Sequence, residues 1–142
     1  ECQAIVMTGY RNCLLLMLPP LLILWVWSAD ILTLWLGSGY QSEHVMVARY
    51  VCAGVLLNGL AHVPVAAMQG MGFPKLVTYV HLIEFLPSIA LFYWLISESG
   101  AVGAAQAWAI RAGVDLLLMH VALILRLRVR RSSVKAARPI AP

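Results

Sequence analysis

Charged residues are scarce in this sequence. Aspartate, glutamate, lysine and arginine make up 11% of the 142 residues, whereas they make up about a quarter of an ordinary soluble domain. Hydrophobic residues make up 62% of the chain, and the mean hydropathy is +0.85. A water-soluble fold of this length could not bury so much apolar surface. The composition therefore excludes a soluble domain and predicts a membrane protein with room for one domain at most.

Several motifs that carry chemistry are also absent. The three cysteines show no CxxC spacing, so we expect no disulfide framework and interpret them as small apolar packing residues. The sequence has neither a phosphate-binding GxxxxGK[ST] loop nor an HExxH zinc motif, and no nucleophile has a convincing base. His81 and Glu84 at i, i+3 are only a weak metal signal. We therefore expect no metal, no cofactor, no catalytic residue and no enzymatic activity.

Long apolar runs dominate what is present. A bilayer core about 30 Å thick needs about 20 helical residues, and four runs satisfy this length: 13–36, 45–68, 76–96 and 103–125. We predict an all-α integral membrane bundle of four transmembrane helices, joined by polar loops at 37–44, 70–75 and 97–102. Because the chain begins with Glu1 rather than methionine, we expect it to be a fragment of a longer protein. Residues 1–12 would then be a linker or the end of an upstream helix.

Lysine and arginine are distributed unevenly. Residues 126–142 form a tail with six basic residues and no acid, and Arg11 and Lys75 lie on the same side of a four-span arrangement. The loops 37–44 and 97–102 contain neither lysine nor arginine. By the positive-inside rule, both termini are cytoplasmic. The tail lacks aromatic residues and a regular three-residue spacing, so we expect it neither to bind nucleic acid nor to sense voltage.

Polar side chains occupy the middle of the apolar runs. Arg111 and Asp115, four residues apart, share one helix face and could pair directly. Asn58, His62 and Glu84 fall at matching depth in the neighbouring spans. Ionisable residues near the bilayer midplane are costly and mark functional sites by default. Two interpretations stay open: a bundle in which an acid merely neutralises Arg111, or a hydrated pathway in which Arg111 attracts a polar or anionic group.

Four stretches resemble, in order and spacing, the C-terminal part of bacterial polysaccharide flippases. The stretches are ILTLWLGSGY, VPVAAMQGMGFPK, HLIEF and GAVGAAQAWAIRAGVD, within about residues 13–126. These flippases export O-antigen and related lipid-linked oligosaccharides and belong to the multidrug/oligosaccharidyl-lipid/polysaccharide exporter superfamily. The resemblance implies a transporter of about twelve to fourteen helices in two bundles around a central cavity, working by alternating access. This chain would supply the last four or so helices.

The resemblance also implies a substrate and a location. The transporter would turn an undecaprenyl-pyrophosphate-linked glycan from the cytoplasmic to the periplasmic leaflet of the bacterial inner membrane. Arg111 would bind phosphate or acidic sugar, and Asn58, His62 and Gln106 would donate or accept hydrogen bonds. Its partners would be the lipid-linked oligosaccharide, membrane lipids and the missing N-terminal helices. Pro64 and Pro87 would kink their helices and let them rock between two open states.

The energy source and two alternative functions follow from the charged residues. Without an ATP motif, we expect an ion gradient or the substrate gradient to drive transport, with Glu84, or less favourably Asp115, as a proton or sodium site. A multidrug or small-cation antiporter of the same superfamily would depend on these acids rather than on Arg111. A non-transporting structural subunit would instead have Glu84 and Arg111 directly paired and dry.

Overall fold

The chain is helical in nearly all of the part that the structure describes, residues 2–39 and 42–136 of a computed structural model. The elements in order are α1 (Cys2–Val26), α2 (Ser28–Leu36), the 3-10 turn η1 (Gly37–Gly39), α3 (Ser42–Gly70) and α4 (Pro74–Ala136). These residues include no strand, and the predicted all-α class is confirmed. The end of the predicted basic tail, residues 137–142, lies outside the described residues.

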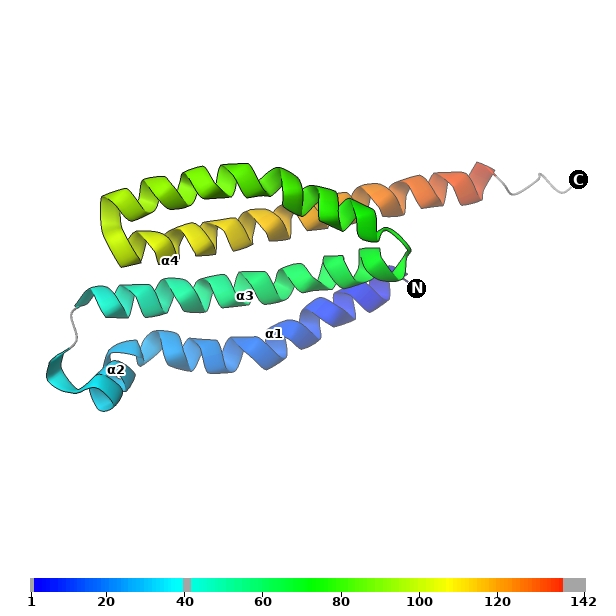
Figure 1. Ribbon diagram of the computed structural model, residues 1–142. Helices are drawn as coiled ribbons and strands as arrows, with labels where there is room; N and C mark the ends of the chain where they lie inside the picture. Colours follow the sequence, from blue (N-terminus) through cyan, green and yellow to red (C-terminus); the bar gives the residue numbers. More distant parts are fainter. Residues whose placement is uncertain (1, 40–41, 137–142) are drawn as a thin grey trace, which may run out of the picture.

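Helix α4 folds back on itself at Gly100. This residue has φ 56° and ψ −127°, a conformation that glycine adopts without the steric cost of a Cβ atom. Figure 1 shows the chain reversing direction there, so that residues 74–99 and 101–136 form two antiparallel arms. We call them the first and second arms of α4. Next to the reversal, Gly103 lies against the carbonyl oxygen of Leu95, where a Cβ atom would collide with backbone.

Three helices are long and apolar enough to cross a membrane: Gln3–Val26, Ser42–Gly70 and Pro74–Val129. The third of these stretches includes both arms of α4. At 1.5 Å of rise per residue, either arm is longer than the hydrocarbon core of about 30 Å. The prediction of a membrane protein built from helices is therefore confirmed.

The beginning of the bundle differs from the predicted span 13–36. Helix α1 starts at Cys2 and ends at Val26, and Trp27 leaves the helical path with φ −93° and ψ 19°. The buried hydroxyl of Ser28 donates to the carbonyl oxygen of Trp25 at this break, over 3.1 Å. The residues on both sides of the break are equally apolar, so hydropathy alone did not reveal it. The helical backbone continues, in contrast, through the prolines inside α1, α3 and α4.

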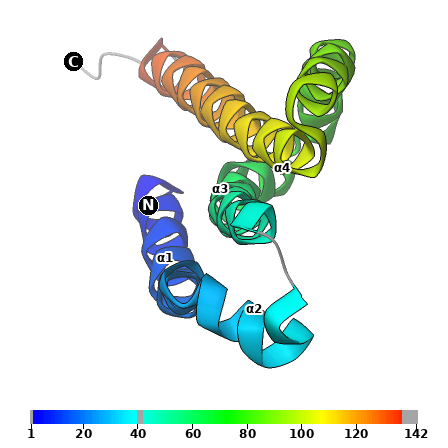
Figure 2. The same ribbon diagram turned by 90° about the vertical axis from the view of Figure 1, so that its left-hand side faces the viewer.

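Helix α3 lies at the centre of the bundle. Figures 1 and 2 show α1 on one side of it and α4 on the other. At Gly54 of α3, an added Cβ would meet the ring of Trp108 and the backbone of Ala109 in the second arm of α4. At Gly59, it would meet Met17 of α1. These glycines let three helices approach closely, which is how membrane helices gain packing contacts.

A hydrophobic core cluster lies at the end of the bundle that holds the α3–α4 turn. A cluster of buried residues there draws on α1, α3 and both arms of α4: Val6, Met68, Val77, Met119 and Leu123. The Tyr10 hydroxyl lies 3.0 Å from Nδ1 of His120, and the two rings meet edge to face. This contact ties α1 to the second arm, so all the long helices converge at this end.

Candidate functional site

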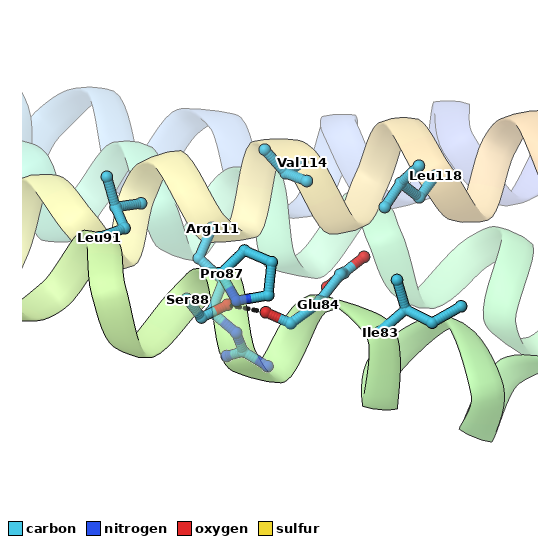
Figure 3. A pocket seen from close by; sticks show the side chains of 8 residues that line it. All are labelled: Ile83, Glu84, Pro87, Ser88, Leu91, Arg111, Val114 and Leu118. Atoms are coloured by element: carbon cyan, nitrogen blue, oxygen red, sulfur yellow. Dashed lines mark hydrogen bonds between the residues drawn. The ribbon is translucent and has the colours of Figure 1, made fainter.

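A cavity of about 180 Å³ lies between the two arms of α4 (Figure 3). Eight side chains line it: Ile83, Glu84, Pro87, Ser88 and Leu91 from the first arm, and Arg111, Val114 and Leu118 from the second. Residues three and four apart fall on one face of a helix, which explains why the first arm contributes at this spacing. The lining is apolar apart from Glu84, Ser88 and Arg111. The cavity therefore combines an apolar lining with one acidic and one basic side chain, Glu84 and Arg111.

Glu84 is buried without a partner. The residue is 5% exposed, and neither carboxylate oxygen has a hydrogen-bond partner among the described residues. The nearby Ser88 hydroxyl donates to the backbone carbonyl of Glu84 over 2.6 Å rather than to the carboxylate. An ionised carboxylate removed from water is costly unless it is paired. The surroundings of Glu84 thus suit a neutral carboxyl group or a carboxylate that has gained a cation.

Arg111 shares this cavity with Glu84 but does not pair with it. Figure 3 shows the guanidinium and the carboxylate pointing in different directions. Arg111 also lines a second hollow of about 540 Å³ on the first arm, whose other residues are Phe85, Ser88, Ile89, Phe92 and Tyr93. The Arg111 side chain therefore forms a wall of both hollows. Among the described residues, the direct Glu84–Arg111 pair expected of a purely structural bundle does not occur.

Asp115 pairs across the two arms rather than along its own helix. Its Oδ1 atom lies 3.2 Å from Nε2 of His81. This contact has the distance of an ion pair but not hydrogen-bond geometry, since the same oxygen has no hydrogen-bond partner. From the sequence, the i, i+4 spacing of Arg111 and Asp115 allowed these two residues to pair with each other. The structure brings His81 of the first arm to Asp115 instead, while Arg111 extends between the arms (Figure 3).

His81, Glu84, Arg111 and Asp115 form one group, which we call the interarm cluster. The charges of the other three members all act on Glu84. Of these four residues, His81 alone was not predicted to be a site residue. It shares a helix face with Glu84, and the spacing of this pair was interpreted only as a weak metal signal. Within the described residues, no group of three or more His, Cys, Asp or Glu side chains is placed to hold a metal ion.

The other predicted substrate residues lie apart from Arg111. His62 is exposed and lines a separate hollow of about 640 Å³ between α1 and α3. Asn58 is exposed on α3, and Gln106 is partly buried on the second arm of α4. Neither lines the hollows around Arg111 or the one that contains His62. Because α3 packs between α1 and α4, its polar residues Asn58 and His62 do not line the hollows around Arg111.

Comparison with known proteins gives one informative match. Over 106 residues the chain is 33% identical to a protein of Shigella flexneri named "Putative O-antigen transporter". The aligned segment covers 75% of this chain but only 25% of that protein. No family model and no solved structure matches the chain. The chain is thus similar to about a quarter of a protein that is named as an O-antigen transporter, and the resemblance predicted from its four sequence stretches is confirmed.

Proposed function

We propose that this chain forms four membrane-spanning helices of a larger bacterial exporter, which reorients lipid-linked oligosaccharide across the inner membrane by alternating access. The spans would be α1, α3 and the two arms of α4. The chain is similar to a protein that is named as a transporter, and about three quarters of that protein's length lies outside the aligned segment. Both facts support this proposal. So does the length of each arm, which is enough for one crossing of the hydrocarbon core.

The arrangement of basic residues supports a cytoplasmic C-terminus. The N-terminus, the α3–α4 turn and the C-terminal end of α4 lie at one end of the bundle (Figure 1). The segments near that end carry Arg11, Lys75, Arg126 and Arg128. Residues 37–39 and 97–102, which form turns toward the opposite end, contain no lysine or arginine. Basic residues favour the cytoplasmic side, so residues 126–142 would form a cytoplasmic tail.

The unpaired guanidinium of Arg111 is the observation that carries the proposed substrate role. Arg111 follows Gly100 by about 16 Å along the second arm, at 1.5 Å per residue, which is close to half of a hydrocarbon core of about 30 Å. No described residue provides it with a hydrogen-bond or ion-pair partner. A diphosphate head group that crosses at this depth needs a cation, and arginine can bind two phosphate oxygens at once.

The remaining predicted residues take supporting roles in this proposal. Glu84 and Asp115 would bind the coupling ion, because they are the acids beside Arg111. Asn58, His62 and Gln106 would line other parts of the substrate path, where helices outside this chain complete the cavity. Pro64 and Pro87 lack the amide hydrogen of a helical hydrogen bond, so α3 and the first arm would bend most easily near them.

A drug or small-cation antiporter is the alternative that one observation favours, namely the two acids of the interarm cluster, Glu84 buried and Asp115 partly buried. A ligand screen on the intact protein separates the two functions. Lipid-linked sugar should bind and should lose binding in Arg111→Ala, whereas cationic drugs should not bind. Tight binding of cationic drugs that requires Glu84, with no binding of lipid-linked sugar, would reject the flippase in favour of the antiporter.

A further inference from the structure

Helix α2 lies across the end of the bundle rather than along it. Figure 2 views the bundle from the end that holds α2 and shows this helix running sideways from the end of α1. Helix α1 has 25 residues and is about 37 Å long at 1.5 Å per residue, which already exceeds a hydrocarbon core of about 30 Å. The nine residues of α2 are too few for a second crossing. Helix α2 therefore begins near the edge of the hydrocarbon core.

The two sides of α2 differ in polarity. Asp30 and Thr33, three residues apart, share the polar side. The opposite side carries Ile31, Leu32 and Trp35. Trp35 is 81% exposed to surroundings that the described residues do not provide. Tryptophan is enriched where the hydrocarbon meets the lipid headgroups, and short helices with one apolar side lie in that layer. Lipid is therefore the surrounding that fits the apolar side of α2.

A buried serine fixes the corner between α1 and α2. Ser28 is the one buried residue of α2, all of which the structure describes. Its hydroxyl donates to the carbonyl oxygen of Trp25 over 3.1 Å, and the same oxygen accepts a hydrogen bond from Nε of Arg49 over 3.3 Å. The hydroxyl thus uses its proton toward α1 and a lone pair toward α3. This contact sets the corner at the level of Arg49.

The terminal nitrogens of Arg49 remain available at this corner. Ser28 accepts the Nε hydrogen, and no acid among the described residues forms an ion pair with Arg49. Arg49 is exposed and lies seven residues, about 10 Å, inside the start of α3. A side chain as long as that of arginine reaches the headgroup layer from such a depth. The guanidinium fork can bind two oxygens of one phosphate group.

We propose that this corner is a phospholipid site, in which Arg49 binds the phosphate of a lipid headgroup and α2 lies in the same layer with Trp35 toward the acyl chains. A phospholipid matches both features, because it carries an anionic phosphate directly above apolar chains. The leaflet is the one at the end of the bundle opposite Lys75 and the basic C-terminal segment. The inference does not depend on the substrate role of Arg111, which lies on the second arm of α4.

The first test measures lipid binding to the delipidated intact transporter in detergent by native mass spectrometry. The probes are phosphatidylglycerol and a diacylglycerol with the same acyl chains but no phosphate. Arg49→Ala should weaken the tightest binding of phosphatidylglycerol by about tenfold or more, because charge-assisted hydrogen bonds are lost. It should leave the weaker binding of diacylglycerol unchanged. Arg49→Gln gives a second reading if the alanine variant does not fold.

Lys75→Ala is the matched control, because it removes an exposed positive charge at the other end of the bundle. Its tightest binding of phosphatidylglycerol should equal that of the wild type. An equal loss in Lys75→Ala and Arg49→Ala would show general attraction of an anionic lipid to a basic protein and would overturn the site. Wild-type affinity in Arg49→Ala would overturn it as well, and so would displacement of the lipid by inorganic phosphate alone.

The second test places α2 in the membrane with spin labels. The intact transporter, with its own cysteines replaced, is labelled at Trp35→Cys or at Thr33→Cys and reconstituted in phosphatidylglycerol-containing vesicles. The label at position 35 should be relaxed mainly by oxygen, which concentrates in lipid, and the label at position 33 mainly by a water-soluble nickel complex. Two labels in water would contradict the lipid contact. Two labels shielded from both reagents would show that other helices of the transporter cover α2, which also overturns the proposal.

Discussion

Replacing Gly103 with alanine tests the close approach of the two arms of α4. A Cβ atom at this position would collide with the carbonyl group of Leu95 and lie 3.1 Å from the amide nitrogen of Ile96. These are backbone atoms, which cannot rotate away as the end of a side chain can. The arms would have to separate beside the Gly100 reversal. Overpacking of this kind costs about 1–3 kcal/mol, and the rigid backbone places the expected loss toward the upper end.

Gly113→Ala in the same arm is the matched control. A Cβ atom there would meet only Cδ1 of Leu57, at 3.6 Å, which is an ordinary van der Waals contact. Alanine is favoured over glycine in a helix by up to about 1 kcal/mol, so this variant should be neutral or slightly stabilising. Thermal unfolding of the intact protein in detergent gives the comparison. Equal stability of the two variants would refute the antiparallel arms, because it would mean that Gly103 does not lie against the backbone of Leu95.

Three further predictions concern the packed end of the bundle and its orientation. Met119→Ala should destabilise by about 2 kcal/mol, the low end for a buried methionine, because lipid also covers this side chain in the unfolded state; thermal unfolding measures it. Tyr10→Phe removes the hydrogen bond to His120 and should cost about 0.6 kcal/mol. If Tyr10→Phe lowers the stability of the His120→Ala variant no further, the two side chains act as a pair. A reporter fused after residue 142 should be active only in the cytoplasm, and periplasmic activity would reverse the proposed orientation.

The sequence predicted the helical class well because composition and run length decide it. A chain with so few charges must place its backbone in helices that satisfy their own hydrogen bonds in lipid. The expected loops 70–75 and 97–102 contain the residues at which the structure turns, because glycine permits the required backbone angles at Gly72 and Gly100. The break at Trp27 was not predicted, since it rests on a buried hydroxyl contact of Ser28 rather than on a change in hydropathy.

The candidate site was predicted less completely, because helical periodicity gives faces but not the pairing of faces. It placed Arg111 with Asp115 and His81 with Glu84 on shared faces. It could not show that the first arm brings His81 to Asp115 and leaves Glu84 without a partner. Such pairings depend on how the arms of α4 are rotated against each other, and that rotation is set by contacts such as the one at Gly103.

Export of O-antigen by the intact transporter tests the role of Arg111 most directly. Cells that lack their own exporter would receive the wild type, Arg111→Ala, Arg111→Lys or the exposed-site control Lys75→Ala, at equal protein levels. A charge-assisted hydrogen bond contributes about 1.5–3 kcal/mol, and 1.4 kcal/mol corresponds to a factor of ten. We therefore predict that Arg111→Ala lowers export by about 10- to 100-fold, that Arg111→Lys retains part of it, and that Lys75→Ala retains all of it. Export by Arg111→Ala at the wild-type level would contradict the account.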